Sequence, residues 1–217
     1  YTHISVILDR TGSMEGIRDD TIGGFNSFLG EQQKETGQAT MTLVQFDGQD
    51  PYEVIHQFTP VKDVAELTRA TYVPRASTPL LDAIGRGIND LEQQISQLPD
   101  PGKPARVVFA IVTDGQENAS TEFTREQIFK MIDSKEKEND WLFVFLSADL
   151  SSVEDARTYG MQSHRIMSYD KESSSVSAAW SSVNSHVSGL RTGKAQDIVF
   201  TDEDRSKHKS EAKRKKS

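Results

Sequence analysis

The stretch that decides the fold is Ile4-Ser5-Val6-Ile7-Leu8-Asp9-Arg10-Thr11-Gly12-Ser13. Its first half is an apolar run typical of a buried strand. A carboxylate and two hydroxyls then follow at two-residue spacing, and side chains spaced by two point the same way in an extended segment. Hydroxyls beside a carboxylate suit a hard, oxygen-seeking cation such as magnesium. The stretch therefore predicts a strand that ends in a metal-binding loop.

Two later segments offer further oxygen ligands. Thr78 precedes a proline at the expected start of a helix, and Asp114 follows the most apolar run of the chain. Parallel strands deliver their carboxyl ends to one edge of an open α/β sheet, where ligands bind. Asp9 and Asp114 are therefore expected to be neighbours. The candidate metal ligands are Asp9, Thr11, Ser13, Thr78 and Asp114.

Taken singly, these residues also have ordinary structural explanations. Ser13 and Thr78 are suitable helix N-caps, and Pro79 would then occupy the first helical position that proline favours. Asp114 precedes a glycine, as in a turn, and Asp9 reads as a solvated charge at a strand end. The metal site is favoured by the five positions together, because the sheet would bring them to one place.

Apolar runs alternate with amphipathic stretches, which predicts an α/β fold with helices on a mostly parallel sheet. The runs at 106–113 and 141–147 are apolar on both faces, so we expect them to be innermost. A four-residue link between the second and third strands is too short for a parallel crossover and predicts an antiparallel edge hairpin. The predicted strands cover residues 3–9, 40–47, 52–59, 106–113, 141–147 and 163–168.

Helices are expected where apolar residues recur at three- and four-residue steps, over 81–98 and 176–190. Two further helix starts, after the fourth and fifth strands, have the spacing of a capping box. These boxes are Thr124 with Gln127 and Ser151 with Glu154.

The composition describes an acidic protein with a basic end. The net charge is −8, but residues 205–216 hold seven Lys and Arg against one acid, which gives +6 there and −14 elsewhere. We expect one folded domain over residues 1–192 and a disordered basic tail over 193–217. Nucleic acid is expected to bind only through this tail, because phosphate contacts need basic side chains.

The sequence predicts a cytoplasmic protein without a membrane partner. It contains no cysteine, which excludes disulfides, thiolate catalysis and thiolate metal sites. No run approaches the ~20 apolar residues of a membrane helix. The first residues lack the basic start and apolar run of a signal peptide.

The candidate ligands resemble the metal-ion-dependent adhesion site of the von Willebrand factor A (vWA) domains, which is written D-x-S-x-S, then a Thr, then an Asp. Residues 9, 11 and 13 match the first motif with Thr11 in place of its first Ser, and Thr78 and Asp114 match the other two. The resemblance covers about residues 1–192. The segments 12–14, 23–26, 77–83 and 113–115 look like those of bacterial and phage intracellular members.

The resemblance implies a doubly wound, Rossmann-like α/β fold whose six-stranded sheet has one antiparallel edge strand and helices on both faces. It also implies a protein-binding module that holds Mg²⁺, with Mn²⁺ or Ca²⁺ as alternatives. In the family, an Asp or Glu of a partner protein completes the metal coordination. Intracellular members look like accessories of AAA+ ATPases or stress-related gene clusters, which makes an AAA+ ATPase a candidate partner.

The main alternative is a magnesium-dependent phosphoryl-transfer enzyme. Thr11 stands where the haloacid-dehalogenase type of phosphatase needs a second Asp. Residues 189–195 lack a spacer residue and the final Ser or Thr of a phosphate loop. Ser13 has no nucleophile-elbow context. We therefore expect a binding protein and no enzyme; the other alternative is a nucleic-acid-associated protein that acts through the basic tail.

Overall fold

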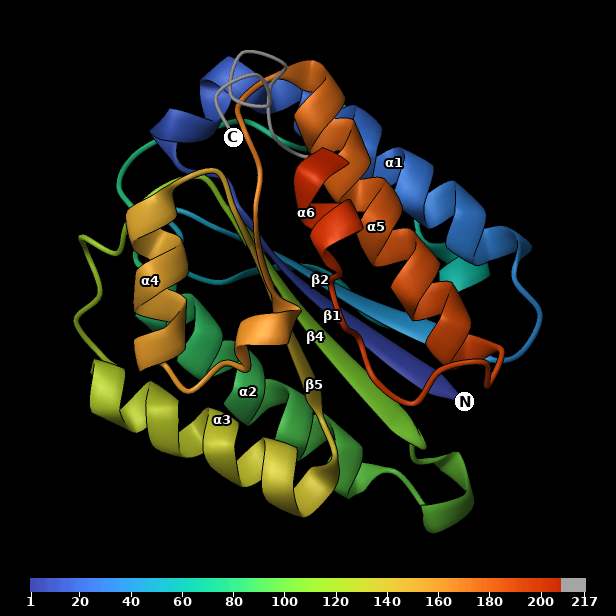
Figure 1. Cartoon of the computed structure of the whole chain (residues 1–217). Coiled ribbons are helices and arrows are strands. Elements are labelled where there is room, and N and C mark those ends of the chain that lie inside the picture. Colours follow the sequence, from blue (N-terminus) through green and yellow to red (C-terminus); the bar gives the residue numbers. More distant parts are fainter. Residues whose placement is uncertain (208–217) are drawn as a thin grey trace.

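The computed structural model describes residues 1–207. They fold into a six-stranded sheet that lies between two layers of helices (Figure 1). The strand order is β3-β2-β1-β4-β5-β6, and every neighbouring pair is parallel except β2 with β3. The α/β fold class with one antiparallel edge strand is thus confirmed. The strands are β1 (Thr2–Asp9), β2 (Ala39–Phe46), β3 (Glu53–Pro60), β4 (Arg106–Thr113), β5 (Leu142–Ser147) and β6 (Ile166–Ser168).

Two details of the predicted sheet are wrong. The central strands are β1 and β4, whereas β5 lies next to the edge strand β6. β5 is apolar because helices cover both of its faces. Since the helices also cover strands away from the middle of the sheet, an apolar strand need not be central. The last strand is also shorter than expected, because residues 163–165 form a 3-10 helix, η4 (Ser163–Arg165).

The helices divide between the two faces of the sheet (Figure 1). Apolar side chains of α1 and α5 cover one face, and those of α2, α3 and α4 cover the other. No helix within residues 1–207 has the length and apolarity needed to cross a bilayer. The helices are α1 (Arg18–Lys34), α2 (Leu80–Gln97), α3 (Arg125–Asn139), α4 (Leu150–Thr158), α5 (Ser173–Arg191) and α6 (Asp202–Lys207).

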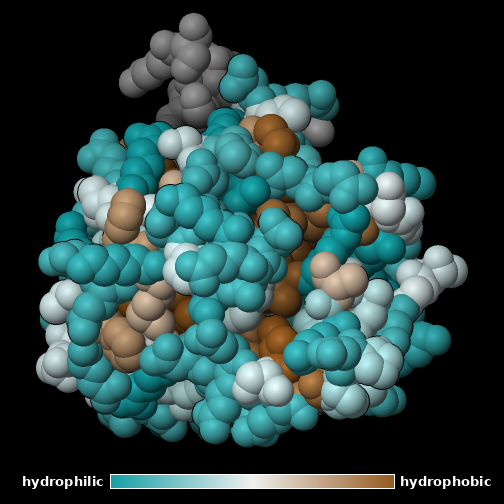
Figure 2. Space-filling view, turned by 90° about the horizontal axis from the view of Figure 1, so that it is seen from below, coloured by the Kyte–Doolittle hydropathy of each residue, from teal (hydrophilic) through white to brown (hydrophobic). Residues whose placement is uncertain are grey.

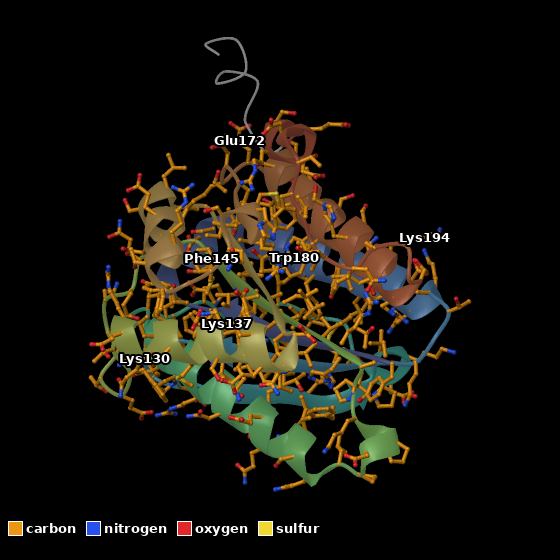
Figure 3. The ribbon with its side chains drawn as sticks, turned by 60° about the horizontal axis from the view of Figure 1, so that its bottom comes forward. Lys130, Lys137, Phe145, Glu172, Trp180 and Lys194 are labelled. Atoms are coloured by element: carbon orange, nitrogen blue, oxygen red, sulfur yellow. The ribbon has the colours of Figure 1, made fainter. Side chains whose placement is uncertain are left out.

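The lower face of the molecule is mostly polar (Figure 2). Seen from below in Figure 2, hydrophilic residues cover most of the surface, and apolar residues show mainly in gaps between them. On the other layer, α1 and α5 approach closely at Gly24, where an added Cβ would lie 2.1 Å from Cδ1 of Trp180. Figure 3 shows Trp180 in the interior of the molecule, between α5 and the rest of the fold. The close approach of Gly24 and Trp180 thus packs α1 tightly against α5.

One of the two predicted capping boxes is confirmed. The Thr124 side chain accepts a hydrogen bond from the Gln127 backbone N–H, and the Gln127 side chain accepts one from the Thr124 N–H. The box at Ser151 is wrong, because Asp149 caps α4 by accepting from the Ser152 N–H at 2.8 Å. An anionic cap at the positive end of a helix dipole is a strong competitor for this position.

The predicted domain boundary at residue 192 is wrong for residues 193–207. Ile198 and Phe200 are 0% and 3% exposed and belong to the core cluster beneath α1 and α5. The Phe200 N–H also donates to the His164 carbonyl at 2.9 Å. Two isolated apolar residues carry no periodic signal, yet they fill the end of this core. Residues 208–217, which hold most of the basic run, lie outside the described part of the chain.

Candidate metal centre

The two candidate aspartates lie side by side at the carboxyl edge of the sheet. β1 and β4 are parallel neighbours with Leu8 opposite Val112, so both strands end at the same level. The Thr113 hydroxyl donates to Oδ2 of Asp9 at 2.6 Å and joins the two strand ends. Asp114 follows directly, and both carboxylates are buried. The predicted proximity of Asp9 and Asp114 is therefore confirmed by the fold.

The first loop brings its two hydroxyls to the same place. Oδ1 of Asp9 accepts from the Thr11 N–H at 2.7 Å, which turns the chain at the end of β1. The hydroxyl oxygens of Thr11 and Ser13 are 3.1 Å apart, and the Ser13 hydroxyl donates to Oδ1 of Asp114 at 2.5 Å. A short 3-10 helix, η1 (Gly12–Ile17), follows this loop. Four of the five predicted ligands thus form one continuous cluster.

Thr78 lies at the rim of the same cluster. A Cβ added to Gly115 would lie 3.4 Å from the Ser13 hydroxyl oxygen and 3.7 Å from that of Thr78, so Gly115 adjoins both hydroxyls. The Thr78 backbone N–H donates to the Asn118 side chain at 2.9 Å, and the Asn118 N–H donates to the Thr78 carbonyl at 3.1 Å. These two bonds hold the second ligand loop against the third.

Neither Ser13 nor Thr78 acts as a side-chain helix cap. α2 begins at Leu80, one residue later than expected, so Pro79 and not Thr78 occupies its N-cap position. Pro79 makes no side-chain hydrogen bond there. The Glu117 carboxylate serves that helix end instead, because it accepts from the Leu81 N–H at 2.8 Å. Both hydroxyls are thereby left to the cluster, and the N-cap interpretation of these two residues is wrong.

Two buried tyrosines support the ligand loops from below. The Tyr72 hydroxyl donates to the Asp9 carbonyl at 2.7 Å, and the Tyr169 hydroxyl donates to the Thr113 carbonyl at 3.2 Å. Burial and the nearby carboxylates raise the pKa of both phenols above the ordinary value, so both remain protonated donors. Sequence reasoning missed them, because nothing in the sequence distinguishes a tyrosine that supports a distant loop from one that only packs.

Lys171 also reaches the site and was not predicted. It lies between β6 and α5, and its Nζ is 2.5 Å from Oδ2 of Asp114. The Asp114 side chain is 0% exposed, whereas that of Lys171 is 46% exposed. Within residues 1–207, Asp114 forms this ion pair and Asp9 forms none. The cluster therefore combines two buried carboxylates with one half-exposed ammonium.

The surroundings of Asp9 disfavour its ionised form. Burial raises its pKa to about 6, hydrogen bonds from Thr113 and Thr11 oppose this rise, and the charge of Asp114 adds to it. A nearby cation would favour the ionised form. Asp9 is thus a buried carboxylate with no cationic side chain paired to it among residues 1–207.

The donor set fits a hard divalent cation. Two carboxylates and three hydroxyls offer only oxygen, which Mg²⁺, Mn²⁺ and Ca²⁺ accept. No group of three or more His, Asp or Glu side chains suited to a metal occurs in the described residues. A divalent site at this edge therefore depends on the hydroxyls of Thr11, Ser13 and Thr78.

Comparison with known proteins shows the fold alone. No family model and no curated protein matches the sequence. Among solved structures, a von Willebrand factor type A protein from Catenulispora acidiphila is similar at a TM-score of 0.56 and 12% identity, over 87% of this chain and 42% of that one. Proximal thread matrix protein 1 of the mussel byssus, in a form with a zinc-occupied MIDAS motif, has a TM-score of 0.56 and 13% identity over 87% and 46% of the two chains.

A third similar structure is the manganese-loaded TRAP protein of Plasmodium vivax, at a TM-score of 0.52 and 12% identity over 78% of this chain and 68% of that one. This chain spans less than half the length of the first two proteins. This chain has the fold of the vWA domains, and two of these neighbours hold a divalent metal, zinc in one and manganese in the other.

Proposed function

We propose that this chain is a protein-binding module that holds its partner through a divalent cation. The observation that carries the proposal is the meeting of two buried carboxylates and three hydroxyls, from three separate loops, at the carboxyl edge of the sheet. Structural neighbours described with zinc or manganese support it. The ligands would be Asp9, Thr11, Ser13, Thr78 and Asp114.

The ligand types explain why a partner would add a carboxylate. Asp9 and Asp114 together balance the charge of a divalent ion, and the three hydroxyls contribute oxygen without charge. A bound ion supplies a positive point charge that attracts one more anionic ligand. The chain carries a net charge of −8, so an acidic partner would be repelled elsewhere on its surface. An Asp or Glu of the partner is the group we propose.

We propose Mg²⁺ as the cation, with Mn²⁺ or Ca²⁺ as alternatives, because the ligands are all oxygen atoms. The resemblance of the motifs to intracellular bacterial and phage members supports a cytoplasmic location and an AAA+ ATPase as a candidate partner. Nucleic-acid binding through the basic tail would depend mainly on residues 208–217, outside the described structure.

We also propose that the chain binds and does not catalyse. Thr11 takes the place of the second aspartate of a haloacid-dehalogenase type of phosphatase, and its hydroxyl lies 3.1 Å from that of Ser13. A threonine hydroxyl does not act as a general acid or base near neutral pH, whereas a carboxylate can. Metal-dependent turnover of a phosphate ester such as p-nitrophenyl phosphate, lost in Asp9→Ala, would overturn this part of the proposal.

The metal site is tested by unfolding the protein with and without magnesium. At one hundred times the dissociation constant, the ion should add about 2.7 kcal/mol to the free energy of unfolding. Asp9→Ala and Asp114→Ala should abolish this gain, whereas Asp133→Ala, which removes an aspartate paired with Lys137 on α3, should keep it. An unchanged magnesium response in both site variants would refute the assignment.

The binding role is tested with a partner isolated by affinity capture in magnesium. The partner should dissociate when EDTA removes the metal, while the domain stays folded. The Asp9→Ala variant should not bind the partner. Replacing the partner's acidic residue by its amide should weaken binding about as much as removing the ion. A partner that binds equally in EDTA and to Asp9→Ala uses another face of the molecule.

A further inference from the structure

The ammonium of Lys171 stands against one of the proposed metal ligands. Its Nζ lies 2.5 Å from Oδ2 of Asp114, and the Ser13 hydroxyl donates to the other oxygen of the same carboxylate at 2.5 Å. Both oxygens of Asp114 are therefore engaged by the chain's own donors. A divalent ion that uses this carboxylate must share or displace one of them.

The position of Lys171 makes displacement feasible. The residue follows β6 in a short loop and precedes α5, and its side chain is 46% exposed, so the ammonium can move into water without opening the core. Figure 3 marks the next residue, Glu172, at the upper end of the molecule, at the start of α5. The Ser13 hydroxyl, by contrast, belongs to the predicted ligand set. Lys171 is the donor to Asp114 that lies outside the predicted ligand set, and its charge would repel a cation bound there.

We propose that Lys171 is a built-in competitor of the divalent cation, which occupies Asp114 in the metal-free protein and lowers the metal affinity of the site. The inference rests on the proposed metal centre and concerns the regulation of that site. Two effects act in the same direction. The lysine must leave Asp114 before the ion binds, and its positive charge repels the ion nearby.

The size of the effect follows from the population of the ion pair. When only a fraction of the molecules has a free ligand, the apparent dissociation constant rises by the inverse of that fraction. A pair formed nine-tenths of the time would weaken metal binding about tenfold. The lysine would thus set the metal concentration at which the module becomes able to bind its partner.

The test is to measure the Mg²⁺ dissociation constant of the full chain by calorimetry for the wild type and three variants. Lys171→Met should bind Mg²⁺ about tenfold more tightly than the wild type. Lys171→Arg keeps the charge and should stay close to the wild type. Lys137→Met is the matched control, because Lys137 pairs with Asp133 on α3, away from the site (Figure 3). It should leave the dissociation constant unchanged.

Each outcome separates this inference from the proposed function. Unchanged or weaker Mg²⁺ binding by Lys171→Met, with a wild type that binds the ion, overturns the competitor role and leaves the metal centre standing. Binding by Lys171→Met alone supports the competitor role but contradicts a metal-loaded wild type. Absence of binding in both folded proteins at millimolar Mg²⁺ refutes the metal centre and this inference with it.

Discussion

Two neighbouring charge clusters, each built around buried carboxylates, differ in their balance of positive and negative groups. The ligand cluster contains Asp9, Asp114 and Lys171, two negative groups against one half-exposed positive group. The arginine cluster begins one residue later and consists of Arg10, Asp47, Glu53 and Arg75, two positive groups against two negative ones.

The arginine cluster is closed on itself. Oδ2 of Asp47 accepts from Nε of Arg10 and from Nε of Arg75, both at 2.9 Å, and Arg10 also pairs with Glu53. Burial alone would raise the pKa of Asp47, but backbone N–H groups of residues 49 and 50 and the two arginines bring that pKa below its ordinary value. Burial raises the pKa of Asp9 to about 6.

The difference teaches that the chain itself can match the charge of a buried carboxylate, as at Asp47, or leave it without a cationic partner, as at Asp9. Backbone hydrogen bonds beside the arginine cluster hold the loops of the candidate site together. The Arg75 N–H donates to the Arg10 carbonyl at 2.9 Å, and the Gly12 N–H donates to the Ala76 carbonyl at 3.1 Å. Ala76 adopts a positive φ of 59°, an unusual conformation that these contacts maintain just before Thr78.

The largest expected effect comes from breaking the closed cluster. Asp47→Ala leaves Arg10 buried with one fewer partner, and loss of a buried partner costs about 3 to 5 kcal/mol of unfolding free energy. Urea denaturation in EDTA measures the loss, and magnesium should not restore it. Asp19→Ala, which removes a surface partner of Arg69, is the control and should leave the midpoint unchanged. A small loss for Asp47→Ala would show that the network contributes little to stability.

A buried group outside both clusters sharpens the comparison through pH. His3 lies at the other end of β1, with Nδ1 2.8 Å from the Thr40 hydroxyl, and burial lowers its pKa from 6.5 to about 3. Below pH 6.5 the unfolded chain takes up a proton that the folded chain does not, so stability falls as the pH falls. Between neutral pH and pH 5 the loss should be about 2 kcal/mol.

The measurement for His3 is the difference between two pH profiles. Urea denaturation of the wild type and of His3→Gln at neutral pH and at pH 5 isolates the contribution of this one group from other titrating side chains. The variant should lose less stability on acidification than the wild type. Equal acid sensitivity would mean that His3 takes up its proton in the folded state.

Neutralising a carboxylate should change the stability of the ligand cluster in the opposite direction from that of the arginine cluster. Asp9→Asn removes a buried charge, and in EDTA near neutral pH we expect a gain of about 1 kcal/mol after the mismatched amide hydrogen bonds are counted. Denaturation in EDTA measures the gain, with Asp47→Asn as the matched variant in the closed cluster. A loss of similar size in both variants would remove the distinction between the two clusters.

The smallest effect is expected at the exposed rim of the closed cluster. Arg75 is 40% exposed, and Asp47 keeps its contact with Arg10 when Arg75 is replaced. Arg75→Met should therefore cost less than about 1 kcal/mol. Its magnesium response, measured by thermal unfolding, should remain, because the Arg75 backbone N–H that holds the loop is retained. Loss of the magnesium response would assign the Arg75 side chain to the ligand loops.

Local patterns predicted most of the fold because they report short-range physics. The apolar runs predicted as strands at 106–113 and 141–147 form β4 and β5, since strands buried on both faces need apolar residues at nearly every position. The same patterns do not show the order of the strands across the sheet. The prediction therefore placed β5 at the centre, where the structure has β1. They also missed Ile198 and Phe200, because two apolar residues in a polar segment show no periodicity.

The sequence by itself determined the oxygen-bearing side chains of the candidate site and the loops that carry them, because a strand end followed by such side chains at two-residue spacing is a local property. Only the tertiary structure decided which charges meet. Lys171 reaches Asp114 across 57 residues, and Arg10 reaches Asp47 across 37. An ion pair depends on distance in space, so a lysine in a polar loop looks like any other until the fold brings it to a buried carboxylate.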